Sequence, residues 1–306
     1  MEAVAINISA AVRAHDEWLE GTGGQRADFR GVTLNDAEFQ DCVLNRAIFN
    51  DATMADANFA GAILVGSTLL NARLDRAILT GADLTETDLS EATLNAVCAT
   101  GILLCDAQMR RTSFKSATLD QARLLDAVFD DANFQAAKMT SAALHHARGA
   151  RANFTEAILD KSVWLNARVP GAKFIQASLV DAQFIGVQAP GCDFTKANLA
   201  GAVFQRAKLG RSNFFQANLT GANLREADLE GADFTQASLT EVRFSGAILG
   251  GADFRGANLK GAKDMTAEQL TRARTNDRTT LPNGKKGPYM RFSEAERPAG
   301  SRVDEG

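Results

Sequence analysis

The chain has 306 residues, of which 45% are hydrophobic, and 33 Lys and Arg against 37 Asp and Glu give a formal net charge of −4. No segment approaches the run of about 18 apolar residues that a membrane span requires, so no span is expected. The first residues also lack the basic and apolar regions of a signal peptide. A net charge this small implies no particular partner, so any information lies in how the charges are distributed.

The first expected element is a helix over residues 9–20. Ser9 is a suitable N-cap and Gly21 is a suitable residue to end the helix. The apolar side chains expected to cover the open end of the following repeat are Val12, Trp18 and Leu19. Residues 1–25 are therefore predicted to form an N-terminal capping segment.

A five-residue repeat occupies residues 26–262. Steps of five from Phe29 to Leu259 pass through 47 central residues without an insertion or deletion, and nearly all of them are large and apolar. The residue two places before each centre is usually Ala. The centres that break the size rule are Ala99, Gly149 and Ala189. A period of five fits neither a helix nor a single strand, so each unit is expected to form a short extended piece followed by a turn of about 90°.

A second period of twenty residues indicates how the units close into coils. Steps of twenty from Phe114 reach Phe254 through Phe centres only, and steps of twenty from Leu159 reach Leu259 through Leu centres only. Five-residue units alone would not keep Phe and Leu on separate tracks. Stacked four-sided coils would, because each wall then carries its own interior column of side chains. About twelve such coils are predicted.

The repeat resembles that of the pentapeptide-repeat family, whose consensus is Ala-Asp/Asn-Leu-x-x. The resemblance covers residues 27–262, and clear matches are Ala82-Asp83-Leu84, Ala197-Asn198-Leu199 and Ala222-Asn223-Leu224. It implies an all-β fold, a right-handed parallel quadrilateral β-helix with Leu or Phe centres and Ala pointing inward. Gyrase-protecting members of the family dimerise through a C-terminal helix.

The period fails at Asp264, where a different segment begins. Thr266-Ala267-Glu268-Gln269 is a capping-box sequence, which predicts a helix to about Thr275 with Leu270 and Ala273 inward. Residues 263–280 are therefore expected to form a C-terminal capping segment, and residues 281–306 a flexible tail. Because the helix is short and offers few apolar residues, we expect a monomer in preference to a homodimer.

One side of the predicted coils departs from the pattern. The residues that define this irregular face are Gly149, Val169, Pro170, Ala189 and Pro190. Because Pro cannot donate a ladder hydrogen bond, we expect this side to be irregular, flatter or slightly indented. Structural drift without a function is the alternative interpretation.

A basic stripe is predicted on the same side. Its residues are Arg110, Arg111, Arg148, Arg151, Arg168, Lys208 and Arg211, opposed only by Asp130 and Asp131. Such a stripe is suited to an anionic partner, although a solvated charged face is the simpler interpretation. No aromatic residues interleave it, so direct nucleic-acid binding is not expected.

The sequence offers no pattern typical of catalysis, a cofactor or a metal. His145 and His146 are expected on the surface, and the four cysteines lack metal-ligand spacing. Cys42 and Cys192 take inward Ala positions and are expected to be inert, whereas Cys98 and Cys105 point outward on different sides.

We therefore predict a non-catalytic binding or scaffold protein whose charged faces meet another protein, without a membrane. A cytoplasmic location is expected, with a secreted effector as the alternative. The alternative function is a DNA mimic that modulates gyrase or another type II topoisomerase. Residues 26–106 hold 12 acidic and 5 basic side chains, as mimicry requires, but residues 107–225 hold 8 and 15.

Overall fold

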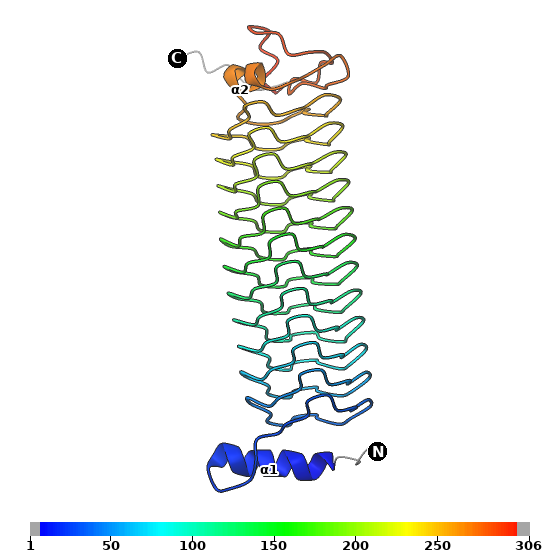
Figure 1. The fold of residues 1–306 in the computed structure, drawn as a ribbon. Helices are drawn as coiled ribbons and strands as arrows, with labels where there is room; N and C mark the ends of the chain where they lie inside the picture. Colours follow the sequence, from blue (N-terminus) through cyan, green and yellow to red (C-terminus); the bar gives the residue numbers. More distant parts are fainter. Residues whose placement is uncertain (1–6, 299–306) are drawn as a thin grey trace. The chain divides into compact units, whose positions relative to one another are not determined.

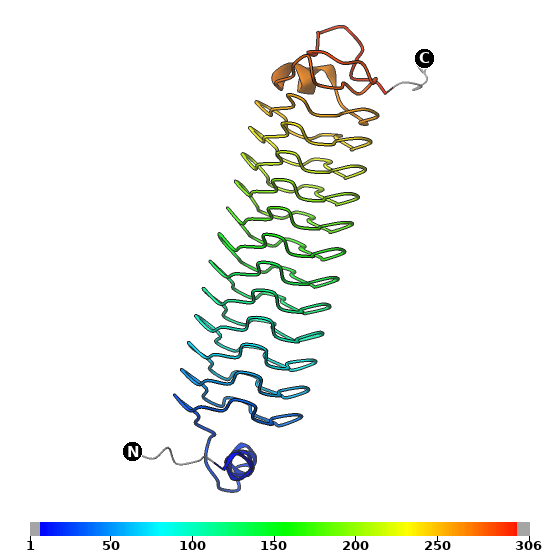
Figure 2. The same ribbon diagram turned by 90° about the vertical axis from the view of Figure 1, so that its right-hand side faces the viewer.

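A computed structural model describes residues 7–298, and the chain divides into two compact units, Met1–Arg148 (unit 1) and Gly149–Gly306 (unit 2). Each unit is described by itself. The helices among the described residues are α1 (Ile8–Glu20) in unit 1 and α2 (Ala267–Arg272) in unit 2. The β-structure consists of isolated bridges, one residue long, in place of extended strands. Figure 1 shows the coils of each unit stacked one on the next, and Figure 2 shows the same stacks from a second side.

Parallel bridges join residues that are twenty positions apart, on four walls. The first rungs of the four ladders are Asp28–Ile48, Thr33–Thr53, Glu38–Asn58 and Val43–Ile63. In unit 1 the ladders continue to Val128–Arg148, and in unit 2 they run from Asn153–Lys173 to Arg243–Lys263. The twenty-residue, four-walled coil predicted from the Phe and Leu tracks is thus confirmed within each unit.

Each corner between walls is a tight turn. The carbonyl of a central residue accepts a hydrogen bond from the N–H three residues later, as from Val32 to Phe29 at 3.1 Å. The residue two after the centre has a positive φ, for example 60° at Asp51 and 66° at Gly171. A four-residue turn with positive φ at its third position is type II, which explains why Gly and Asp are frequent there.

The centres fill the interior of each unit, and the Phe residues stack face to face. In unit 2, the column from Phe154 to Phe254 has ring centroids 4.8–5.1 Å apart with interplanar angles of 4–8°. Rings on other walls meet this column edge-on, as Phe204 does with Phe194 at 5.9 Å and 83°. All of these rings are fully buried, so each coil is held by the coils next to it.

Helix α1 begins and ends by capping, and its buried residue is a histidine. The N-cap is Asn7, whose Oδ1 accepts from the N–H of Ala10 at 3.1 Å, so the prediction of Ser9 as N-cap is wrong by two residues. Gly21, with φ of 71°, ends the helix as predicted. Leu19, expected to cover the first coil, is 37% exposed, whereas His15 is fully buried.

His15 connects α1 to the first coil. Its Nδ1 accepts a hydrogen bond from the N–H of Ala27 at 3.0 Å, and its ring stacks on Trp18 with centroids 5.4 Å apart. Nε2 is buried without a hydrogen-bond partner of ordinary geometry. Burial lowers the pKa of His15 from its usual 6.5, and the nearby carbonyl of Asn45 opposes this only in part. The neutral ring is therefore the form that suits this contact.

The end of unit 2 continues two of the ladders with residues outside the repeat. Helix α2 starts at the predicted capping box, with Gln269 N–H donating to Thr266 Oγ1 at 3.1 Å, but ends at Arg272 and not near Thr275. Beyond it, Arg274 bridges to Asp253 and Thr280 bridges to Asn258. The backbone after the helix thus serves as a partial further coil.

The segment that was expected to be a flexible tail, residues 281–306, makes defined contacts over its described part. Leu281 and Ala295 are buried, and the N–H of Leu281 donates to the carbonyl of Lys285 at 2.8 Å. The N–H of Asn283 donates to the carbonyl of Ala295 at 3.2 Å. Residues 299–306 lie outside the described part of the chain, so the expectation for them stays a prediction.

Replacing Phe214 by Ala is predicted to destabilise the protein by about 3–5 kcal/mol, because it leaves a cavity between the Phe194 and Phe234 rings, 4.9 and 4.8 Å away. The neighbouring Phe215 points outward and is half-buried, so Phe215→Ala is the matched control, with an expected cost of about 1 kcal/mol or less. Urea unfolding followed by circular dichroism measures both. Equal costs would contradict a core built on the Phe column.

Acidification is predicted to weaken the attachment of α1. Because the folded pKa of His15 is lowered, its stabilising contribution is complete above pH 6.5 and is lost as the pH falls toward the lowered value. Asp16 and Arg26 act on this pKa in opposite directions and do not remove the effect. Fluorescence of Trp18, titrated downward from about pH 8, follows the change.

The control for this titration is His15→Asn, whose Oδ1 can accept the Ala27 hydrogen bond without titrating. The variant should show no Trp18 transition near the histidine range. A transition of the same midpoint in both proteins would assign it to carboxylates elsewhere.

Candidate partner-binding surface

The part of the predicted basic stripe that belongs to unit 1 is largely neutralised by acidic neighbours. Arg110 Nη1 lies 3.3 Å from Gln108 Oε1, and Arg110 Nε lies 3.9 Å from an Asp130 carboxylate oxygen. Arg111 forms an ion pair with Glu91, one coil away, and this bond raises the pKa of Arg111. The prediction that only Asp130 and Asp131 oppose the stripe is therefore wrong.

Glu91 was missed because it lies twenty residues before Arg111, so a count of charges near each centre along the sequence does not include it. Arg148, the third basic residue of unit 1, is exposed, and its backbone bridges to Val128. The unit 1 part of the stripe is thus less positive than its three arginines alone would make it.

In unit 2 the basic residues stand on two adjacent columns. Arg168, Gln188 and Lys208 follow one another on one parallel ladder, so the two cations lie about 10 Å apart at the usual strand spacing. Arg151 and Arg211 occupy the next corner, with φ of 57° and 58°. All four basic side chains are exposed.

These cations surround a surface with few side chains. Arg151 extends over Gly171, where an added Cβ would lie 3.7 Å from its Cγ, and Arg211 extends over Gly231 at 3.6 Å. Within the described residues, no ion pair joins Arg168, Lys208 or Arg211 to an acid. The stripe is therefore most strongly positive in unit 2.

The prolines of the predicted irregular face leave the ladder intact. In unit 2, Gly149, Val169 and Ala189 each donate to the carbonyl 19 residues later at 2.9 Å. Pro170 and Pro190 follow these centres, at the second position of the type II turn, where Pro is favoured and where no ladder N–H is needed. The expected loss of ladder bonds is not found there, and an indented binding face stays a prediction.

Polar groups stand at inward positions close to this face. Trp164, fully buried, donates from Nε1 to Ser162 Oγ at 2.8 Å and stacks on Phe184 at 5.2 Å. Ser212 Oγ donates to the carbonyl of Ala189 at 3.1 Å. Serine at an Ala position is the sequence signal for such buried bonds.

The family described as "Pentapeptide repeats (8 copies)" matches residues 25–163 and 177–266, far more than half of the chain. The chain belongs to the pentapeptide-repeat family. No curated protein matches it by sequence.

Solved structures of other pentapeptide-repeat proteins resemble the chain. HetL of the cyanobacterium Nostoc sp. strain PCC 7120, involved in heterocyst differentiation regulation, is 24% identical, over 92% of this chain and 99% of HetL, with a TM-score of 0.33. QnrB1, a plasmid-mediated fluoroquinolone resistance protein, is 16% identical, over 69% and 92%, with a TM-score of 0.35. A protein of the Arabidopsis thaliana thylakoid lumen is 27% identical, over 36% and 66%, with a TM-score of 0.22. Because the TM-scores are low, the assignment depends on the repeat itself.

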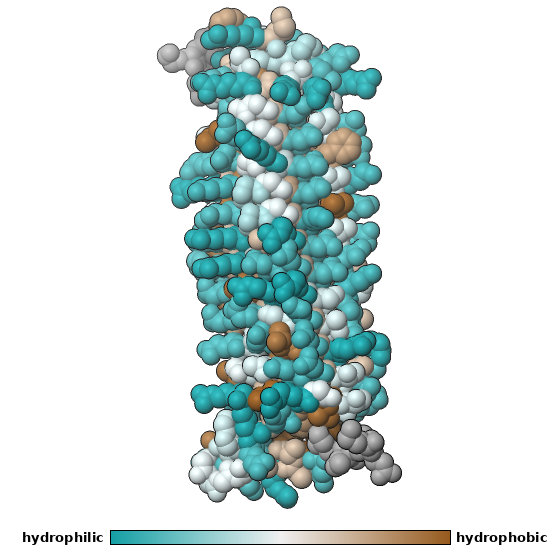
Figure 3. Space-filling model, in the orientation of Figure 1, coloured by the Kyte–Doolittle hydropathy of each residue, from teal (hydrophilic) through white to brown (hydrophobic). Residues whose placement is uncertain are grey.

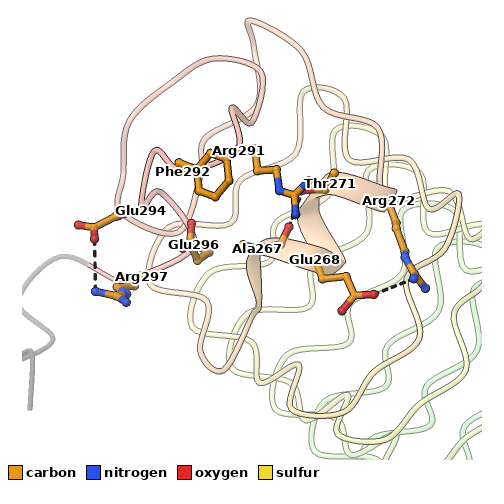
Figure 4. Close-up of a pocket in the computed structure, with 9 residues that line it drawn as sticks. All are labelled: Ala267, Glu268, Thr271, Arg272, Arg291, Phe292, Glu294, Glu296 and Arg297. Carbon is orange, nitrogen blue, oxygen red and sulfur yellow. Dashed lines mark hydrogen bonds and ion pairs between the residues drawn. The ribbon is translucent and has the colours of Figure 1, made fainter. Parts of the chain in front are cut away.

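This pentapeptide-repeat chain also has a pocket of about 660 Å³ between α2 and the segment after it, which the sequence did not predict. Figure 4 shows its nine lining residues, among them Glu268 and Arg272 from α2 and Phe292 from the later segment. Arg272 pairs with Glu268 at 2.7 Å and Arg297 with Glu294 at 3.6 Å. Charges of both signs are thus paired within the pocket lining.

Two large apolar side chains of the segment after α2 are exposed. Phe292 is 87% exposed beneath the guanidinium of Arg291, 5.2 Å from the ring centroid, and Met290 is 66% exposed. Tyr289 donates from its hydroxyl to Glu296 at 3.1 Å, and burial together with this carboxylate raises the pKa of Tyr289. Elsewhere, in the view of Figure 3, hydrophilic side chains predominate and hydrophobic ones lie singly or in small groups.

The described residues contain no group of three or more His, Cys, Asp and Glu side chains suited to a metal ion. Neither described helix is long and apolar enough to cross a membrane. His145 is half-buried and His146 is exposed on a corner with φ of 58°.

The cysteines differ in exposure, which leads to a prediction on thiol chemistry. Cys98 is exposed, whereas Cys192 is buried, and burial raises the pKa of Cys192 to about 12. In the native protein near neutral pH, we expect a water-soluble disulfide reagent to modify Cys98 quickly and Cys192 only after unfolding. Mass spectrometry of timed samples measures this, with Cys98→Ser as the control. Rapid labelling of Cys192 in folded protein would contradict its inward position.

Proposed function

We propose that this pentapeptide-repeat protein is a non-catalytic binding protein that presents charged walls of its coils to another protein. The observation that carries the proposal is the group of basic residues in unit 2, Arg168, Lys208 and Arg211, which lack an acidic partner in the described chain. Some other basic residues do pair with an acid on the next coil, as Arg206 does with Glu226 at 2.7 Å.

The surroundings of these cations support a macromolecular partner. The interior behind them is filled by buried side chains such as Val169, Ala189 and Leu209, so a small molecule would find little to enclose it. Pro170 and Pro190 sit at turn positions that restrict the backbone, which lowers the entropy lost on binding. A protein with an acidic surface is the partner that this charge favours.

The segments outside the repeat complete the proposal. Residues 1–25 and 263–280 would serve as caps, because α1 bonds the first coil through His15 and Gln269 Nε2 donates to the carbonyls of Phe244 and Ala247. Covered ends would keep the coils from pairing with other chains through their open ladders.

Charge reversal in unit 2 tests the proposal. We expect Arg168→Glu with Lys208→Glu to reduce capture of the partner from lysate at low salt by at least about tenfold, because the partner would then meet like charges. The matched control reverses Arg243 and Lys263, which are exposed on another wall of unit 2 and give the same change in net charge. Quantitative mass spectrometry compares the captured proteins. Equal losses in both variants, or none in either, would rule out this surface.

The second candidate, a DNA mimic that modulates gyrase, has weaker support. QnrB1 is described as a fluoroquinolone resistance protein, but its likeness to this chain carries no functional argument. In unit 1, Arg76 pairs with Asp56 and Arg111 with Glu91, which reduces the negative potential that mimicry needs. A supercoiling assay with purified gyrase tests this second candidate, because a DNA mimic should inhibit the enzyme or protect it from a quinolone.

A further inference from the structure

The backbone ladders of unit 1 have an unpaired edge at the first coil. Along the repeat of this unit, the N–H of a bridging residue donates to a carbonyl in the coil before it, as Asn58 does to Ala37 at 2.9 Å. The carbonyl of the same residue accepts from a centre of the coil before it, as Asn58 does from Phe39 at 2.7 Å. The first coil has no earlier coil, so its bridging residues can form these bonds only with residues outside the repeat or with another molecule.

Helix α1 closes the interior of the first coil but pairs with only one side of its backbone. The helix crosses the start of the stack in Figure 1 and is seen nearly end-on in Figure 2. The bond between α1 and the backbone of the coil runs from Ala27 N–H to His15 Nδ1 at 3.0 Å. The interior of this coil is closed, since its four centres are buried, namely Phe29, Leu34, Phe39 and Leu44.

Four residues on the next two walls carry the unpaired backbone groups. Within the described residues, the N–H and carbonyl groups of Thr33 and Glu38 have no hydrogen-bond partner, and neither have the carbonyls of Asn35 and Gln40. We call these backbone groups the open edge. Thr33 is exposed, whereas Thr53, the equivalent residue one coil later, is half-buried and has both ladder bonds. The comparison of the two threonines shows that the described part of the chain does not cover this edge.

The end of the repeat in unit 2 shows that the chain can close such an edge. There, Arg274 N–H donates to the Ala252 carbonyl at 2.8 Å, and Thr280 N–H donates to the Ala257 carbonyl at 2.9 Å. Among the described residues 7–26, no segment makes comparable bonds with the open edge. An unpaired ladder edge is a template for pairing with another chain.

The open edge is rich in acceptors and is bordered by carboxylates. Its ladder carbonyls outnumber its ladder N–H groups. Asp36 and Asp41 occupy the corners on either side of Glu38, each with φ of 56°. Within the described residues, no ion pair joins Asp36, Glu38 or Asp41 to a cation. Burial, and then the charges of Asp16 and Asp41, raise the pKa of Cys42 on the same coil, so α1 adds a further carboxylate here.

The arginines of this coil do not neutralise the open edge. Arg30 pairs with Asp28 at 2.6 Å. Arg26 Nε donates to the carbonyl of Arg46, whose corner is diagonal to that of Asp36 in the four-walled coil. The open edge therefore favours a partner that brings both hydrogen-bond donors and positive charge.

We propose that the open edge is a second binding surface, which takes an extended, arginine-containing segment of a partner protein. The backbone of such a segment would add a strand to the ladder, with donors for the Glu38 and Gln40 carbonyls and an acceptor for the Glu38 N–H. Arginine side chains to either side would reach Asp36 and Asp41, because a guanidinium carries several N–H donors and keeps its charge.

This surface is separate from the basic residues of the proposed function. It lies in unit 1, has the opposite charge, and offers backbone groups in addition to side chains. It is also the part of the first coil that the proposed N-terminal cap leaves uncovered. A partner segment that continues from Glu38 to Thr33 would turn at the Asp36 corner, as the chain's own coils do.

Hydrogen exchange resolved to single amides tests whether the edge is unpaired. In the free full-length chain, the amides of Thr33 and Glu38 should exchange at least about a hundredfold faster than those of Thr53 and Asn58, which are bonded in the ladder. Slow exchange at Thr33 and Glu38 would overturn the proposal, because the edge would then already be occupied. Protection that falls on dilution would assign it to a second copy, and protection that does not would assign it to the chain itself.

Peptide binding tests the kind of occupant. The probe is a short fluorescent peptide of alternating Arg and Val, whose anisotropy is measured at low salt. It should bind the full-length chain and slow the exchange of the Glu38 amide. The same peptide with Glu in place of Arg should bind at least about tenfold more weakly. The Arg peptide with methylated backbone amides keeps its charge but lacks backbone donors, and should also bind at least about tenfold more weakly.

Removing charge from the two corners supplies the variant. Asp36→Asn with Asp41→Asn should weaken binding of the Arg peptide at least about fivefold. The variant should fold, because asparagine tolerates the positive φ at both positions. The matched control is Asp106→Asn with Asp126→Asn, which removes the same charge from corner residues with φ of 58° and 57° away from the open edge. The control should bind like the unmodified chain.

A further variant separates this surface from the proposed function. Arg168→Glu with Lys208→Glu, in unit 2, should bind the Arg peptide like the unmodified chain. Failure of the Arg peptide to bind, or equal binding of the Arg and Glu peptides, would overturn the proposal. So would equal binding of the methylated and unmethylated Arg peptides, or equal losses in the corner variant and its control.

Discussion

The interaction on which the structure depends is the parallel backbone bond between residues nineteen to twenty-one positions apart. Phe29 N–H to the Ile48 carbonyl, at 2.7 Å, is the first of these bonds, and the spacing does not change along the five-residue repeat of either unit. Because the spacing is constant, a residue type that recurs every twenty positions becomes a column. The Phe column and the corner ion pairs both follow from that single constraint.

The constraint explains why the interior could be predicted from the sequence. Phe194 stands directly between Phe174 and Phe214, and that order is visible as a period of twenty before any coordinates are known. Corner chemistry was harder to judge. From the sequence, Pro170 predicts an interrupted ladder, because the sequence does not show which N–H groups the ladder uses. In the structure Pro170 is the second residue of a type II turn, whose N–H the ladder does not need.

Surface electrostatics was predicted less well, for a geometric reason. Arg111 and Glu91 are distant in sequence and adjacent across a coil, so charges counted over a run of residues misjudge the local field. The segments outside the repeat were the least predictable. His15 shows no periodicity that marks it as a buried contact to Ala27, and the chain after Arg272 gives no sign that Arg274 and Thr280 continue the ladders.

The regularity of the corners has a consequence for how such a chain can change length. Removing five residues from unit 1 would keep every centre apolar and every later corner in a permitted turn, so the interior would tolerate it. All later outward side chains in that unit, however, would move to the neighbouring wall or corner of the coil. Asp106 would then leave the corner that it shares with Arg46. Removing twenty residues would shorten the stack by one whole coil and leave every later side chain on its original wall. The number of repeats and the surface pattern are therefore coupled. Only whole coils can be gained or lost without changing which outward side chains share a wall.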